Sequence, residues 1–145
     1  SSGIQATATI AALDEGAKVI MFLAEGLNNP YLNRDRKLFE QVLDHDGLLL
    51  SQQEWDEPLH PNMLAARNHA MARMSDAVVV CECRIPSGVF SLCDEAMSAN
   101  TPVFAVPGNI TSEASRGCNA LIAAGAALVI DPVSLLDELQ SIRKK

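Results

Sequence analysis

The sequence predicts an α/β fold in which a mostly parallel sheet is covered by helices on both sides, a three-layer and doubly wound arrangement. Segments whose apolar residues recur at helical spacing alternate along the chain with short, continuous apolar runs, and the links between them are short. The apolar runs are rich in β-branched residues, as strands buried on both faces are. With 145 residues the chain is long enough to bury a core, and we expect residues 1–145 to form a single domain.

The first half of the chain is expected to contain three helices and two strands. In chain order these are a helix over 4–15, a strand over 17–23, a helix from about 34 to 46, a strand over 48–51 and a helix over 61–74. Gly16 ends the first helix, and Asn33 is a suitable N-cap for the second. Pro61 fits the first turn of the third helix, because its missing N–H has no helical partner there. The inner stripe of the second helix consists of Leu38, Phe39, Val42 and Leu43.

The second half is expected to alternate strictly between strands and helices. In chain order these are a strand over 77–83, a helix over 89–99, a strand over 103–106, a helix over 116–124, a strand over 127–130 and a helix that starts at 131–132. Ser115 is a suitable N-cap for the helix over 116–124, and Gly125 supplies its left-handed stop. Asp94 and Glu95 are expected to point outward from the helix over 89–99.

The turn after the strand over 103–106 is the first candidate binding site. Pro107 and Gly108 end that strand, and the next helix follows with Ser115 and Arg116 at its start. Free amides and the positive end of the helix dipole attract an anion to a turn of this kind. Taken alone, an ordinary loop between a strand and a helix is the alternative interpretation.

Arg67 is the second candidate, because it falls in the middle of an apolar helix face. That face is formed by Met63, Ala70, Met71 and Met74. A guanidinium there needs either an internal carboxylate or a bound anion, since burying it without a partner is costly. Arg84 and Arg116 each follow a strand, and α/β folds bind ligands at the carboxyl ends of their strands. We therefore expect the three arginines to gather at one rim.

The overall composition limits what this rim can bind. A net charge of −7 argues against a protein coated with phosphate-binding lysines, and 4% aromatic residues argue against a large stacking platform for bases. Any anion site must therefore be local. No apolar run reaches the roughly 20 residues of a membrane span and no signal peptide is visible, so we expect a cytoplasmic protein without membrane contact.

The cysteines are expected to be small buried thiols in a reducing cytoplasm rather than metal ligands. They are Cys81, Cys83, Cys93 and Cys118. The C-x-C spacing of the first two differs from the usual C-x-x-C spacing of zinc sites, and no histidine lies at ligand spacing nearby. The chain also has neither a G-x-G-x-x-G fingerprint nor a P-loop. No metal and no cofactor are therefore expected.

Several motifs, in matching order along nearly the whole chain, resemble the DprA/Smf family. They include the Arg67-Asn68-His69 segment and the Ser87-Gly88 pair. The most similar are Ala-Val-Pro-Gly-Asn-Ile over 105–110 and Ser-Arg-Gly-Cys-Asn-Ala-Leu-Ile over 115–122. This combination is far more specific than any single loop.

The resemblance implies a Rossmann-like domain that binds single-stranded DNA, and we expect no enzymatic activity. Members of the family protect incoming DNA in natural transformation, load the RecA recombinase onto it for DNA recombination, and usually form homodimers. The family's DNA-facing motifs fall on Arg67, Asn68, Ser87, Gly88, Ser115, Arg116 and Gly117. With Arg84, Pro107 and Gly108, these residues make up the candidate interface.

The chain departs from the family pattern at several positions, and each change either lowers its positive charge or removes a contact. The family's opening strand and its Gly-Ser-Arg loop would lie before Ser1, so we expect a fragment whose sheet lacks its first strand. His69 stands in place of the second arginine of the Arg-Asn-Arg segment and is expected at the surface, Pro86 replaces a basic residue, and Gln5 replaces an aspartate. Because phosphate neutralisation supplies most non-specific affinity, DNA binding by this chain alone is expected to be weak.

Two other functions are compatible with the same fold. Residues 86–95 loosely resemble a segment of nucleoside-monophosphate phosphoribohydrolases, in which case Arg67 would hold the phosphate and Glu95 or Asp94 would assist cleavage of the bond between ribose and base. A nucleotide-sensing or purely structural module is the other alternative, because a fold does not fix a function.

Overall fold

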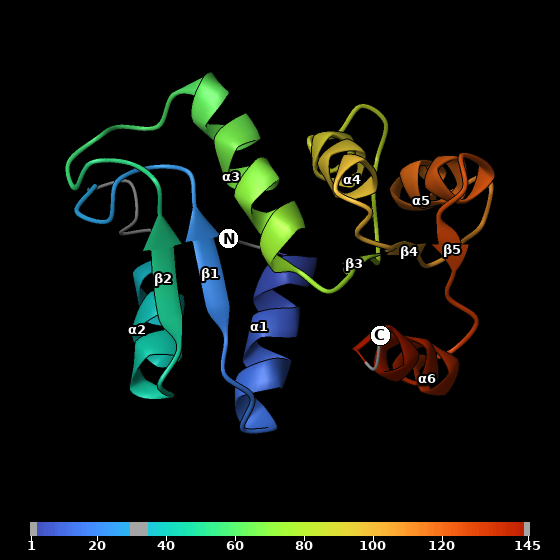
Figure 1. Ribbon diagram of the computed structural model, residues 1–145, viewed down its shortest axis with the longest axis horizontal. Coiled ribbons are helices and arrows are strands. Elements are labelled where there is room, and N and C mark those ends of the chain that lie inside the picture. The colour runs from blue at the N-terminus through green and yellow to red at the C-terminus, as the bar shows by residue number, and fades with distance from the viewer. Residues whose placement is uncertain (1–2, 30–34, 144–145) are drawn as a thin grey trace. The chain divides into compact units, whose positions relative to one another are not determined.

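The computed structural model describes residues 3–29 and 35–143 (Figure 1). The chain divides into two compact units, Ser1–Arg67 and Asn68–Lys145, and helix α3 (Pro61–Met74) contains the boundary between them. Every strand pair in the described residues is parallel, which confirms the predicted α/β class. These strands form two sheets, one in each unit. The expectation of a single domain stays a prediction.

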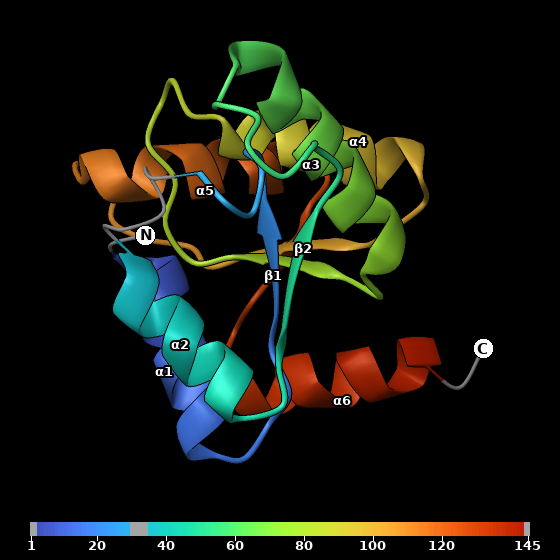
Figure 2. The ribbon, with the colours of Figure 1, turned by 90° about the vertical axis from the view of Figure 1, so that its left-hand side faces the viewer.

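The first unit is a two-stranded sheet with helices packed beside it. Strand β1 (Ile20–Leu23) pairs with β2 (Leu48–Ser51) in a register that places Ile20 opposite Leu48. Helix α2 (Arg36–Asp44) packs on β2 and against α1 (Ile4–Asp14) (Figure 2). Gly16 has a φ of +74° directly after the end of α1, as predicted.

The apolar stripe of α2 was predicted correctly except at one position. Leu38, Phe39 and Val42 are buried, as is Leu13 of α1. The prediction for Leu43 is wrong, because its side chain is exposed. Leu43 follows Val42 by one residue and is therefore rotated by about 100° around the helix axis from it. The predicted cap Asn33 lies outside the described residues.

The second unit has the predicted three layers. Strands β3 (Val78–Val80), β4 (Val103–Ala105) and β5 (Ala127–Leu128) lie side by side in that order. Helices α4 (Val89–Ser98) and α5 (Glu113–Ala123) cover one side of the sheet, and α6 (Pro132–Arg143) lies on the other (Figures 1 and 2). A helix connects each strand to the next parallel strand, so the carboxyl ends of β3, β4 and β5 lie at one edge of the sheet.

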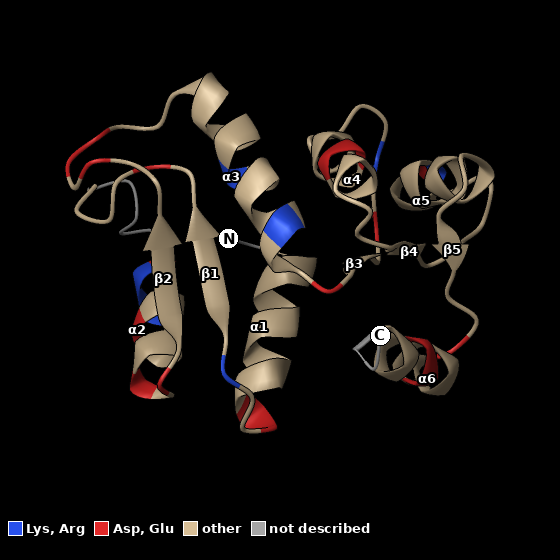
Figure 3. Cartoon of the chain, viewed as in Figure 1, with Lys and Arg blue, Asp and Glu red and all other residues tan. Residues whose placement is uncertain are grey.

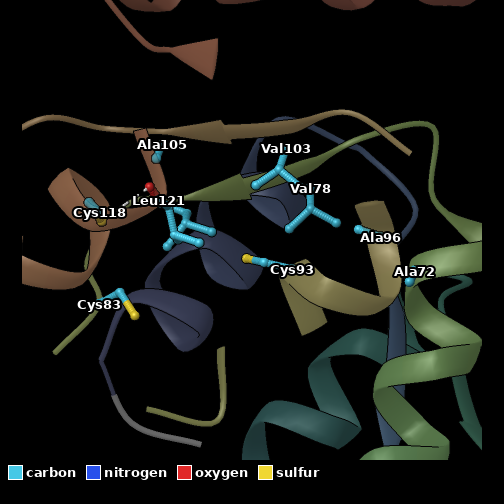
Figure 4. Packing of buried hydrophobic residues seen from close by; sticks show 10 residues of the cluster. Ala72, Val78, Cys83, Cys93, Ala96, Val103, Ala105, Cys118 and Leu121 are labelled. Carbon is cyan, nitrogen blue, oxygen red and sulfur yellow. Dashed lines mark hydrogen bonds between the residues drawn. The ribbon is translucent and has the colours of Figure 1, made fainter. Parts of the chain in front are cut away.

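The core of the second unit is built between the sheet and the two covering helices. Figure 4 shows Cys83, Cys93 and Cys118 converging around Leu121, with Val78 and Val103 of the sheet above them. These three cysteines are buried, as expected, and all four cysteines are free thiols. Cys81 contradicts the expectation, because it is exposed: β3 ends at Val80, and Cys81 is the first residue of the following loop.

Several details of the elements also differ from the prediction. Of the five described strands, β2 has the predicted bounds and the other four are shorter than predicted. Val79 of β3 is 39% exposed, so β3 alternates between buried and exposed residues. Helix α5 begins at Glu113 with Ser112 as its N-cap, so Ser115 is not the cap. Ser112 has the extended backbone that an N-cap needs, whereas Ser115 already donates its amide to the Ser112 carbonyl within the first turn. Met74, expected on the buried face of α3, is exposed.

Within residues 3–29 and 35–143, no helix has the length and the apolar character needed to cross a bilayer.

Candidate nucleic-acid interface

The second unit presents two loops and a helix end at the carboxyl edge of its sheet. The loop over 81–88 follows β3, the turn over 106–112 follows β4, and the N-terminus of α5 comes directly after that turn. In parallel sheets this edge is where ligands bind. Of the predicted interface, Arg84, Ser87, Gly88, Pro107, Gly108, Ser115, Arg116 and Gly117 come from these segments.

The start of α5 is attached directly to the loop after β3. The Cys83 amide donates to the Ala114 carbonyl over 2.9 Å, and the Gly117 amide donates to the Cys83 carbonyl over 2.7 Å. A Cβ at position 117 would collide with that carbonyl oxygen and lie 2.6 Å from the Cys83 Sγ. Gly117 is buried, so its part in the candidate interface is to let α5 approach this loop rather than to contact a ligand.

The turn after β4 is held to α5 by a reciprocal pair of hydrogen bonds. The Gly108 amide donates to Asn119 Oδ1 over 3.1 Å, and Asn119 Nδ2 donates to the Gly108 carbonyl over 3.0 Å. Gly108 also lies against the Ser115 hydroxyl, which leaves no room for a Cβ. The Gly108 amide is therefore already used, and the Ser115 amide donates to the Ser112 carbonyl, so the candidate amides for an anion in the first turn of α5 are those of Glu113 and Ala114. Sequence reasoning quoted Asn119 in a motif but gave it no role.

The two arginines of this edge differ in their surroundings. Arg116 Nη1 donates to Glu113 Oε1 over 2.9 Å, and both side chains are more than half exposed. An exposed pair of this kind contributes only about 0–1 kcal/mol, so a phosphate competes with it readily. Arg84 is exposed on the loop between β3 and α4, where Figure 3 shows a basic position.

The Ser87-Gly88 pair lies at the N-terminus of α4. The Ser87 Oγ accepts a 3.2 Å hydrogen bond from the Val89 amide, so it satisfies one of the first amides of this helix. Asn68 is buried and its Nδ2 lies 3.4 Å from the Gly88 carbonyl oxygen. Asn68 thus holds the end of the loop through the Gly88 carbonyl. The Ser87 Oγ acts as an acceptor in its bond with the Val89 amide, so its own proton can be donated to an anion.

His69 lies between the side chains of Glu95 and Arg73. Its Nε2 accepts from Arg73 Nε over 3.0 Å, so its Nδ1 carries the proton and donates to Glu95 Oε2 over 2.7 Å. The prediction of a surface position for His69 is confirmed, because its side chain is about half exposed. Glu95 was expected to be a solvated charge, but its carboxylate is held by His69. The neighbouring Asp94 is exposed, as predicted.

Arg67 belongs to the first unit, whereas Arg84 and Arg116 belong to the second. Burial lowers the pKa of Arg67 below its ordinary value, and the negative charge of Glu25 acts in the opposite direction. The proximity of Glu25 favours the internal ion pair among the two alternatives for this residue. The gathering of all three arginines at one rim stays a prediction.

Comparisons with known proteins identify the family. The model of the family described as DNA recombination-mediator protein A matches residues 1–140. The chain is 34% identical over 140 residues to DNA processing protein DprA of Streptococcus pneumoniae, covering 97% of this chain and 49% of the relative. It is 33% identical over 138 residues to protein Smf of Escherichia coli, covering 95% of this chain and 37% of that protein.

Solved structures give the same result for the fold. The X-ray structure of DprA from Streptococcus pneumoniae matches with a TM-score of 0.82 at 34% identity, over 94% of this chain and 48% of that one. A structure of DprA from Helicobacter pylori, whose subject is its unique mode of binding single-stranded DNA, matches with a TM-score of 0.77 at 20% identity, over 97% and 76% of the two chains. The chain thus spans half or less of the length of its relatives from Streptococcus pneumoniae and Escherichia coli. With a family model matched over residues 1–140, the chain belongs to the DprA/Smf family of DNA recombination mediators.

Proposed function

We propose that this chain supplies a single-stranded DNA-binding surface of a DprA-type recombination mediator. The observation that carries the proposal is the attachment of α5 to the carboxyl edge of the sheet, which holds Arg116, Ser115 and the first-turn amides of α5 next to the turn after β4. Family membership supports the same function, and the Helicobacter pylori relative is described as binding single-stranded DNA.

The contacts in this proposal go mainly to phosphate. Arg84 and Arg116 neutralise charge, the hydroxyls of Ser87 and Ser115 donate hydrogen bonds, and the start of α5 adds its dipole. With a net charge of −7 the rest of the surface repels DNA, so the affinity depends on these few groups. The expected binding is weak, strongly dependent on salt and indifferent to sequence.

Removing Arg84 and Arg116 together is expected to weaken DNA binding about tenfold at low salt, since two phosphate contacts are lost. The measurement is fluorescence anisotropy of a labelled oligothymidylate titrated with the R84A/R116A variant at several salt concentrations. The slope of log K against log salt should become shallower by about 1.4, which is two contacts at about 0.7 each for a single strand. Glu113→Gln should strengthen binding, because it releases Arg116 from its intrahelical partner.

A matched control is Arg36→Ala, which removes an arginine from another exposed helical ion pair, that with Glu40 on α2. Its DNA affinity should equal that of the parent. If R84A/R116A binds the oligonucleotide as tightly as the parent at every salt concentration, the proposed surface is wrong. Thermal stabilisation by mononucleotides, with no oligonucleotide binding, would instead favour the nucleotide-sensing alternative.

We propose further that the chain acts by binding and not by catalysis. In the phosphoribohydrolase alternative Glu95 or Asp94 assists cleavage, and of these the Glu95 carboxylate already accepts the 2.7 Å hydrogen bond from His69. Incubation with AMP should release no adenine above the buffer rate when products are separated by liquid chromatography. Adenine release that disappears in Glu95→Gln or in Asp94→Asn would restore the enzymatic interpretation.

The remaining family properties are proposals for the whole protein. We propose a homodimer, for which the exposed Ile130, Val133 and Leu136 offer apolar surface in the second unit. A RecA recombinase is the proposed protein partner, and natural transformation the proposed setting. Four free cysteines support a reducing, cytoplasmic location. We also propose that residues 1–145 belong to a single Rossmann-like domain, as the family match over residues 1–140 suggests.

A further inference from the structure

The loop after β2 carries the single tryptophan of the chain on its surface. Trp55 is 70% exposed, although a tryptophan is usually among the more buried side chains of a protein. Its loop, over 52–60, follows the carboxyl end of β2, and the loop over 24–29 follows the carboxyl end of β1. Both belong to the first unit, and neither takes part in the proposed DNA contacts of the second.

The backbone around Trp55 is held in place by the neighbouring loop. The Trp55 carbonyl accepts from the Asn28 amide over 2.7 Å, and the Glu57 carbonyl accepts from the Gly26 amide over 2.9 Å. Gly26 lies so close to the Glu54 and Trp55 carbonyls that a Cβ would collide with both. The two loops therefore form one fixed platform, and the exposed indole is presented from a defined position.

Side chains add to this platform. Asn28 Nδ2 donates to Asp56 Oδ1 over 2.6 Å, and Asn29 Nδ2 donates to the Glu57 carbonyl over 3.1 Å. Ser51 Oγ donates to the Glu25 carbonyl over 2.8 Å and accepts from the Gln53 amide over 3.0 Å. These bonds link the two loops on either side of Trp55. The loops are therefore already ordered, and binding a partner costs little further conformational entropy.

The charge around the indole decides what it can bind. The segment over 52–60 contains Glu54, Asp56 and Glu57 and has neither lysine nor arginine. Figure 3 shows acidic positions on both loops that follow β1 and β2. Glu57 has His60 at 3.6 Å, and Asp56 uses one oxygen for Asn28, whereas the Glu54 side chain is exposed. An exposed indole alone would stack on a nucleobase, but the three acidic residues within two positions of Trp55 in sequence repel the phosphates of a nucleic acid.

We propose that Trp55, with Glu54 and Asp56, binds an arginine side chain in a basic segment of a partner protein. A guanidinium stacks on the face of an indole through cation–π attraction, and its N–H groups are geometrically suited to carboxylate oxygens. The platform offers both kinds of contact, one from the ring and the other from the acids on either side of it in sequence. None of these three residues is among the proposed DNA contacts.

The test uses Trp55 as its own reporter, because no other tryptophan contributes to the emission. The chain is titrated with an acetylated peptide of four Arg-Gly repeats while tryptophan fluorescence is followed, and a peptide with citrulline in place of arginine serves as the uncharged isostere. We expect a saturable change with the arginine peptide that weakens as salt is raised, and none with the citrulline peptide. Glu54→Gln should weaken binding about threefold to tenfold.

Trp55→Ala is tested by anisotropy of a labelled arginine peptide and should bind at least tenfold more weakly. Ile110→Ala, which truncates an 84% exposed side chain of the second unit, is the matched control and should bind like the parent. Equal binding of the arginine and citrulline peptides, no saturable signal, or full affinity in both Trp55→Ala and Glu54→Gln would each overturn the proposal. So would a saturable response of Trp55 to an oligothymidylate, which would make the indole a nucleobase platform.

Discussion

Replacing Gly117 by alanine is expected to destabilise the second unit by about 3 kcal/mol, which is the upper range for overpacking a close contact. The new methyl group would collide with the backbone carbonyl of Cys83, and this carbonyl also accepts the Gly117 amide. Backbone on both sides prevents a simple rotamer change from relieving the collision. Helix α5 must therefore move away from the loop after β3, and the carboxyl edge of the sheet loses its arrangement.

Urea unfolding followed by far-UV circular dichroism measures this loss. Gly88→Ala is the matched control, because Gly88 has an ordinary helical φ of −65° and nothing within 4 Å of an added Cβ. The control should be close to neutral, since alanine is accommodated without strain. An unfolding midpoint for Gly117→Ala equal to that of Gly88→Ala would show that α5 is not held against Cys83 in the way described.

Alkaline pH is expected to destabilise the second unit through its buried thiols. Burial raises the pKa of Cys93 to about 11, and negative charge on Cys83, Asp94 and Cys118 acts in the same direction. The folded protein thus keeps this proton at pH values where the unfolded chain, with an ordinary thiol pKa near 9.0, has released it. Stability is complete below pH 9 and falls between pH 9 and about 11, by on the order of 3 kcal/mol in total.

The measurement is the free energy of unfolding in urea at several pH values between 8 and 10.5. Cys93→Ala should lower stability at every pH and flatten this pH dependence. The slope that remains is expected from Cys118, whose pKa is raised mainly by burial. Cys81→Ala is the control, because Cys81 is exposed and its charge adds to the raised pKa of Cys118 but not to that of Cys93, so its removal should change the slope much less than Cys93→Ala does. A slope that stays the same in Cys93→Ala would contradict the assignment to Cys93.

Local sequence signals predicted the elements better than their ends. The bounds of α3 follow directly from Pro61, which starts the helix, and from the strand signal that comes after Met74. The start of α5 was missed because Ser112 and Ser115 are equally good caps by composition. Tertiary contacts select Ser112: the hydrogen bonds of Ala114 and Gly117 with Cys83 fix the position of the first turns of the helix.

The candidate interface was predictable in its residues but not in their partners. Arg116 and Glu113 are three positions apart, so their ion pair was visible in the sequence as a helical pair. The bond between His69 and Glu95 joins residues 26 positions apart, and that between Asn28 and Asp56 joins residues 28 apart. No periodicity reports such pairings, because they depend on how loops and helices are packed. The Trp55 platform was missed for the same reason.

The pairing of Gly108 with Asn119 restricts the chemistry of position 119. The side-chain amide of Asn119 acts here like a peptide group: it gives one donor and one acceptor to the backbone of Gly108, which lies beyond the end of β4. Aspartate has the same shape but offers only acceptors, and leucine offers neither. Asn119 therefore joins the turn after β4 to helix α5, and the turn keeps its shape only while the side-chain amide is intact.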